Sequence, residues 1–206
     1  MRLTTRRPSS GAALLASRRP RGALLDESSL NYIAPIGRLV AACTRPIDAL
    51  MDAFRSGDGV PYSDYGADLH EGQARFTRPM FENLIGTEWL PAVVDFHERL
   101  RSEPPARVAD VACGEGHSSI AIARAYPKVH VDGVDSDEAS ITAARRHLER
   151  SDVEDRLTFH LTDAAEPELD GRCELVTIFE ALHDMSYPVE VLRAAGGWSP
   201  KTGRSW

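Results

Sequence analysis

The stretch VADVACGEGHSSIAIARAYPKVHVDGVDSDEAS, residues 108–140, decides the fold. It contains a short apolar run, a glycine-rich turn, a helical pattern, a second apolar run and a pair of acids. Apolar runs that alternate with helices of this length predict parallel strands joined by right-handed crossovers. The stretch therefore predicts half of a nucleotide-binding α/β unit, with the glycine turn and the start of the helix beside the nucleotide.

The same alternation continues to about residue 195. We expect strands at 107–112, 129–135, 157–162 and 174–182, and helices at 117–126, from 136, and from 187 or 188. This pattern predicts an α/β fold with an incomplete Rossmann-like sheet of about four parallel strands. Upstream, residues 44–57 predict a short helix capped by Thr44, and residues 74–100 predict helical pieces interrupted by Pro79, Gly86 and Pro91.

Composition divides the 206 residues into four parts. Residues 1–28 are rich in Arg, Ser, Pro and Gly and predict a disordered tail. Residues 29–103 predict a helical cap segment, which either packs on the sheet or forms a lid over a substrate pocket. Residues 104–195 predict the nucleotide-binding domain, and residues 196–206 predict a polar tail.

Charge and cysteine content narrow the function classes. The net charge of −7 argues against a general nucleic-acid binder. No apolar run reaches the roughly 18 residues that a membrane span needs. The three cysteines lie far apart and form no CxxC pair, which is typical of a reducing compartment, so we expect a cytoplasmic protein. The seven histidines show no HExxH or comparable spacing, so we expect no metal site.

The turn after the first strand distinguishes two kinds of nucleotide. Gly114 and Gly116 allow a tight turn and a close approach of the ligand, but a dinucleotide fingerprint needs a third glycine where Ser119 stands. Asp110 precedes the turn, and a carboxylate there would repel a pyrophosphate yet suit a ligand with an ammonium and a sulfonium. Asp135 ends the second strand, where either class of nucleotide places its ribose hydroxyls.

A third acid extends the pattern. Asp163 follows the third strand and can accept a hydrogen bond from an adenine amine, with Ala164 beside it to donate a backbone N–H. Acids after three successive strands therefore predict a site for a cationic, adenosine-bearing ligand.

Four segments in order resemble the successive motifs of the class I S-adenosylmethionine-dependent methyltransferases. They are VADVACGEGHSS, VDGVDSDEAS, FHLTDAAEPE and ELVTIFEALHDM, and the resemblance covers about residues 105–195. It implies a Rossmann-like methyltransferase sheet, S-adenosylmethionine as cofactor and a small-molecule methyl acceptor. The residues it implies at the cofactor are Asp110, Ala112, Gly114 and Gly116 for methionine, Asp135 and Ser136 for ribose, Asp163 and Ala164 for adenine, and Phe179 beside the methyl group.

The end of the fourth strand supplies the candidates for catalysis. Glu180 would border the methyl group and acceptor, and Glu180, His183 and Asp184 are candidate bases for an acceptor that must lose a proton. For His183, a structural hydrogen-bonding role is an equal alternative. No NPPY or DPPY tetrapeptide follows this strand, so methylation of an amino group or nucleobase of that type is not indicated.

Two other function classes stay open. One is a non-catalytic S-adenosylmethionine-binding remnant, and the other is an NAD(P)-dependent oxidoreductase, which Asp110, Ser119 and Asp163 disfavour. The family sheet has seven strands and this sequence supplies four, so we expect a truncated domain with little or no turnover. The apolar fourth strand would then leave one sheet edge uncovered, which predicts self-association through that edge.

Overall fold

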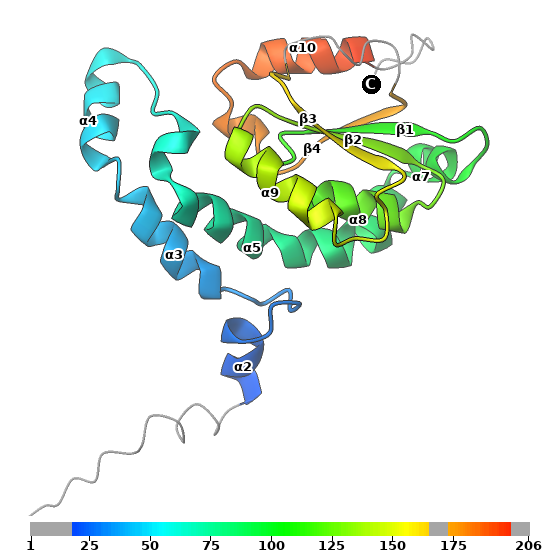
Figure 1. The fold of residues 1–206 in the computed structure, drawn as a ribbon, viewed down its shortest axis with the longest axis horizontal. Coiled ribbons are helices and arrows are strands. Elements are labelled where there is room, and N and C mark those ends of the chain that lie inside the picture. Colours follow the sequence, from blue (N-terminus) through cyan, green and yellow to red (C-terminus); the bar gives the residue numbers. More distant parts are fainter. Residues whose placement is uncertain (1–17, 165–172, 199–206) are drawn as a thin grey trace, which may run out of the picture.

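The computed structural model describes residues 18–164 and 173–198. Four parallel strands form one sheet in the order β3-β2-β1-β4 (Figure 1). The strands are β1 (Arg107–Val111), β2 (His130–Asp135), β3 (Leu157–Leu161) and β4 (Leu175–Ile178). This arrangement confirms the predicted α/β class and the parallel, Rossmann-like sheet.

The two central strands are buried on both faces. In β1, the four residues from Val108 to Val111 are buried, and in β2 the four from Val131 to Val134 are buried. A strand covered on both sides needs a nearly continuous apolar run, which is why the sequence identified it. The exceptions, Asp110 and Asp132, are buried acids that each have hydrogen-bonding partners.

Helices cover both faces of the sheet (Figure 1). Helices α8 (His117–Ala125) and α9 (Glu138–Leu148) lie on one face, with α5 (Ala67–Leu84) packed outside them. This side holds the larger core, which includes Phe81, Ile122 and Phe159. Helix α10 (Pro188–Trp198) covers the other face, where a smaller core contains Val111 and the buried Trp198.

The N-terminal part is helical, as predicted, but its boundaries differ. Its other elements are α2 (Arg18–Leu24), α3 (Ala34–Cys43), α4 (Ile47–Ser56), η1 (Tyr62–Tyr65), the π-helical η2 (Ile85–Trp89), α6 (Leu90–Ala92) and α7 (Val94–Arg101). Thr44 caps the C-terminus of α3, not the start of α4. None of the described helices is both long and apolar enough to cross a membrane.

The predicted break at Pro79 is wrong, because α5 continues through it. A proline in a helix removes one backbone hydrogen bond and costs roughly 3 kcal/mol. Pro79 is buried, so its ring contributes to packing of α5 against the rest of the protein. Burial of this face offsets the lost hydrogen bond.

Both predicted tails fall partly within the described residues. Of residues 1–28, the first 17 lie outside them, and Arg18–Leu24 form α2. At the other end, α10 runs three residues beyond the expected domain boundary at 195, and the backbone N–H of Cys173 donates to the carbonyl of Trp198 at 2.8 Å. Residues 199–206 lie outside the described part of the chain.

The fourth strand is shorter than predicted. It ends at Ile178 instead of residue 182, because Glu180 adopts a left-handed backbone conformation with φ of 53°. Among the described residues β4 pairs with β1 alone, and its Val176 and Ile178 are half-buried next to the smaller core. Self-association through this edge stays a prediction.

Candidate functional site at the carboxyl edge of the sheet

The turn between β1 and α8 is shaped by three residues with positive φ. Ala112 has φ of 54°, Gly114 of 54° and Gly116 of 80°. A Cβ on Gly114 would meet no atom within 4 Å, so the space above this residue is open to a ligand. A Cβ on Gly116 would lie 2.3 Å from Phe159, so this glycine is required for packing of the turn on the sheet. Ala112 adopts a conformation that costs a non-glycine residue about 1–2 kcal/mol.

Asp135 holds this turn in place. One carboxylate oxygen accepts a hydrogen bond from the N–H of Gly114 at 2.8 Å, and the other accepts from the N–H of Asp137 at 2.9 Å. Partial burial raises the pKa of Asp135, although these backbone hydrogen bonds oppose the shift. Each oxygen keeps a further lone pair, so the carboxylate can still accept hydroxyl donors. The structure thus places the Asp135 carboxylate, at the end of β2, next to Gly114 and the open space above it.

Asp110 has a different environment from the other two acids. Its side chain is buried, and one oxygen accepts from the hydroxyls of Ser118 at 2.6 Å and Ser119 at 2.7 Å. The other oxygen accepts from the hydroxyl of Thr177 at 2.9 Å. Burial raises the pKa of Asp110, against the effect of the three hydroxyls. In this structure the carboxylate connects β1 to α8 and to β4, beneath the turn.

The third acid lies at the end of β3. The N–H of Thr162 donates to the carbonyl of Asp135 at 3.0 Å, which brings the ends of β2 and β3 together. Asp163 follows and is exposed, Ala164 is half-buried, and Ser136 is exposed beside Asp135. These predicted residues therefore share the carboxyl edge of the sheet with the glycine turn.

The residues after β4 separate into two groups. Phe179 joins an aromatic cluster, with its ring centroid 5.7 Å from that of Phe81 and 5.8 Å from that of Trp89. Glu180 is exposed, and the side chain of His183 is 68% exposed, with its Nε2 3.5 Å from a carboxylate oxygen of Asp184. The aromatic ring is thus held by the helical segment, whereas the three candidate bases, Glu180, His183 and Asp184, face solvent.

Two residues of the helical segment extend to this edge, and sequence analysis gave them no role. The rings of Tyr62 and His70 stack with centroids 4.4 Å apart, and His70 Nδ1 lies 3.6 Å from a carboxylate oxygen of Asp137. Burial, followed by the charges of Asp135 and Asp137, raises the pKa of Tyr62 to about 12. We call Tyr62 and His70 the roof pair. In the sequence, the tyrosines Tyr62 and Tyr65 in the loop before α5 are the signal that points to this pair.

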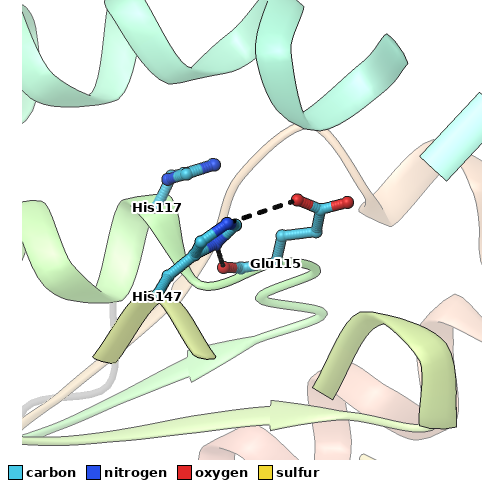
Figure 2. Close-up of side chains that lie close together, drawn as sticks. All are labelled: Glu115, His117 and His147. Carbon is cyan, nitrogen blue, oxygen red and sulfur yellow. Dashed lines mark hydrogen bonds and ion pairs between the residues drawn. The ribbon is translucent and has the colours of Figure 1, made fainter. Parts of the chain in front are cut away.

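A second group of side chains lies beside the turn (Figure 2). Glu115 from the turn, His117 from α8 and His147 from α9 bring their ligand atoms within 4.8 Å of one another. Burial, His147 and Arg78 lower the pKa of His117 to about 3, so its ring is neutral at ordinary pH. The expectation of no metal site considered spacing along the sequence and missed this convergence in space.

A hollow of about 350 Å³ lies at the opposite edge of the sheet, lined in part by Arg107, His130 and Asp132. Ligands of open α/β sheets bind outside the carboxyl ends of the strands. We therefore assign the functional site to the carboxyl edge and not to this hollow.

Comparison with known proteins agrees with the geometry. Residues 102–202 match a family model described as a methyltransferase domain. The 27-O-demethylrifamycin SV methyltransferase of Amycolatopsis mediterranei is 34% identical over 90 residues, which are 43% of this chain and 33% of that protein. The release factor glutamine methyltransferase of Mycobacterium leprae is 30% identical over 167 residues, which are 80% of this chain and 52% of that protein.

A solved structure shows the same fold. An O-methyltransferase family protein from Burkholderia thailandensis superposes with a TM-score of 0.58 at 18% identity, over 87% of this chain and 54% of that chain. The chain thus spans between a third and about half of the length of the relatives it matches. The family model and these relatives support a class I S-adenosylmethionine-dependent methyltransferase, a family whose cofactor is S-adenosylmethionine, and the sheet order and the solved structure show the same fold.

Proposed function

We propose that this chain binds S-adenosylmethionine at the carboxyl edge of its sheet and transfers the methyl group to a small molecule. The observation that supports this most directly is the pairing of Gly114 with Asp135. The glycine leaves open space above the turn, and the carboxylate beside it keeps lone pairs for hydroxyl donors. A nucleoside with two ribose hydroxyls fits this combination of an open backbone and an acceptor.

Each of the other residues would contact a different part of S-adenosylmethionine. Asp135 and Ser136 would bind the ribose, Asp163 and Ala164 the adenine, and the backbone of Ala112 and Gly114 the methionine part. Asp110 would act as a positioning residue, since its carboxylate is already bonded to three hydroxyls below the turn. Bound S-adenosylmethionine supplies a methyl group on a good, neutral leaving group, so the protein mainly aligns the acceptor and excludes water.

The aromatic cluster at the end of β4 favours an acceptor with an apolar ring. Phe179 contacts Phe81 and Trp89, and such rings bind flat apolar groups through stacked or edge contacts. The relative from Amycolatopsis mediterranei is named for the methylation of an oxygen of rifamycin. We therefore propose a hydroxyl on an aromatic small molecule as the acceptor, with Glu180 or His183 as the base.

Turnover of this chain alone should be low. Glu180 and His183 are both exposed among the described residues, so solvent competes with an acceptor for their hydrogen bonds. A chain that binds the cofactor without catalysis is the second candidate, and the exposure of both bases favours it.

Calorimetry and a transfer assay separate these functions. The full chain should bind S-adenosylhomocysteine, and NAD should give no heat at the same concentrations. Methyl transfer from radiolabelled S-adenosylmethionine should then be measured against a panel of phenols, carboxylates and amines. Product with phenols alone would support the proposed acceptor, whereas binding without any product would support the non-catalytic alternative. Binding of NAD but not of S-adenosylhomocysteine would overturn both.

A further inference from the structure

Glu115, His117 and His147 form a compact cluster outside the residues assigned to the cofactor. Figure 2 shows the three side chains close together, with dashed lines between His147 and Glu115. Their potential ligand atoms all lie within 4.8 Å of one another, and all three residues are half-buried. Residues 117 and 147 are 30 positions apart, so the packing of α8 against α9 creates the cluster.

The hydrogen bond of His147 fixes which nitrogen is available. Its Nδ1 lies 3.0 Å from the backbone carbonyl of Glu115, and a carbonyl can only accept, so Nδ1 carries the proton. In the neutral ring, Nε2 then has a free lone pair, which lies 4.0 Å from a carboxylate oxygen of Glu115. Histidines that bind metals typically donate their other N–H to a backbone carbonyl in this way.

His117 supplies a second imidazole without a competing partner. Across residues 18–164 and 173–198, neither of its ring nitrogens forms a hydrogen bond with protein, and its ring stacks on His147 with centroids 4.7 Å apart. The alternative is an ordinary ion pair between a protonated His147 and Glu115. That alternative gives no role to His117, a half-buried polar ring beside the pair.

We propose that Glu115, His117 and His147 bind one divalent cation of the zinc type. Two imidazoles and one carboxylate form a ligand set that suits zinc and leaves a fourth position open. On a tetrahedral zinc, with bonds of about 2.0–2.2 Å, the ligand atoms lie roughly 3.3–3.5 Å apart. The widest separation in the cluster must therefore shrink by up to about 1.4 Å, and because the two rings are stacked at an interplanar angle of 24°, one ring must turn so that both lone pairs point at one ion.

Charged residues on α5 have opposite effects on cation binding at this cluster. Arg78 lies close enough to His117 to act on its charge and disfavours a cation, but it forms an ion pair with Glu82 at 3.0 Å. Glu71 acts on Glu115 from the same helix and favours a cation. Because Glu115 stands between Gly114 and Gly116, a bound cation would also connect the cofactor turn to the end of α9.

Zinc binding to the full chain, without a histidine tag, tests this site. Competition with a chromophoric chelator should show one zinc per chain, and cobalt should give the visible absorption of a tetrahedral site without thiolate charge-transfer bands. The variants His117→Gln and His147→Gln should each weaken zinc binding by about 100-fold, the upper end of what losing even a supporting group costs. His130→Gln, an exposed histidine at the opposite edge, is the matched control and should bind like the parent chain.

Glu115→Gln keeps the size of the side chain and removes its charge. It therefore still tests the site if the histidine variants do not fold. It should retain the parent's circular dichroism and lose the tetrahedral cobalt spectrum. Parent-like zinc affinity in both histidine variants would overturn the proposal, and so would failure of the parent chain to bind zinc at micromolar concentration. Thiolate charge-transfer bands would also overturn it, because they would place the ion at a cysteine.

Discussion

Replacement of Asp110 by alanine should unfold the protein more than it weakens cofactor binding. The carboxylate accepts from Ser118, Ser119 and Thr177, whose side chains are all buried. Alanine would leave the buried hydroxyls of Ser118 and Ser119 without this acceptor and Thr177 with only the carbonyl of Ala109 at 3.4 Å, and it would create a small cavity between β1, α8 and β4. If Asp110 contacts the ligand, as the sequence predicts, its replacement should mainly lower affinity. If it holds β1, α8 and β4 together beneath the turn, its replacement should mainly lower stability.

The magnitude follows from two opposing contributions. Each hydrogen bond to a charged group contributes about 1.5–3 kcal/mol, but the buried carboxylate itself costs several kcal/mol in lost hydration. Burial raises the pKa of Asp110 against the effect of its three hydroxyl partners, in line with this second contribution. We expect Asp110→Ala to lower the free energy of unfolding by about 2–4 kcal/mol. For a chain of this size that corresponds to a fall in Tm of roughly 5–15 °C.

Thermal unfolding and calorimetry with S-adenosylhomocysteine form the assay. Asp110→Asn, which keeps one acceptor oxygen and the size of the side chain, should lose about half as much stability. Thr177→Val removes one of the three hydroxyls and should lose about 1 kcal/mol. In the folded variants, affinity should stay within about threefold of the parent, since no direct contact is lost. A variant at Asp110 with unchanged Tm and an affinity tenfold lower or worse would refute the reasoning, because the carboxylate would then face the ligand.

Two further predictions concern the same edge of the sheet, and a third concerns Asp132, which lines the hollow at the opposite edge. Asp135→Ala should weaken binding of S-adenosylhomocysteine by about 1.5–3 kcal/mol in calorimetry, and parent-like affinity would remove this residue from the site. Ala112→Gly should raise the free energy of unfolding in urea by about 0.5–1 kcal/mol, because glycine tolerates the φ of 54° there, whereas Ala123→Gly inside α8 should lower it. Burial would raise the pKa of Asp132, but hydrogen bonds from its basic neighbours lower it from 3.8 to about 2. That contribution, about 2 kcal/mol, is therefore present above pH 4 and lost as the pH falls to 2. Urea unfolding of Asp132→Asn should lack this part of the acid dependence, and an identical pH profile would contradict it.

The sheet could be predicted from the sequence because its signals are local. β1 and β2 are continuous buried runs, and each predicted boundary lies within a residue of the observed one. The errors arose where a single residue departs from the local rule. Pro79 lies inside a helix because its ring is buried, and β4 ends early because the backbone at Glu180 turns into the left-handed region.

The site was predictable only as a set of positions. Acids at the ends of β1 and β2 can be identified by counting, but the direction of a carboxylate depends on partners far along the chain. Asp110 is bonded to Thr177, 67 residues away, and its environment is therefore invisible in its own segment. The cluster of Glu115, His117 and His147 escaped notice for the same reason, since its spacing matches no local metal motif.

Asp137 connects the roof pair to the cofactor turn. Its side chain caps α9 by accepting from the N–H of Ser140 at 2.8 Å and lies 3.6 Å from His70, while its own N–H donates to Asp135. Asp135 in turn holds Gly114, so one chain of contacts runs from α5 to the open glycine. Movement of His70 away from the sheet would remove a partner from Asp137 at the start of α9. The helical segment is therefore connected to the glycine turn through Asp137 and Asp135.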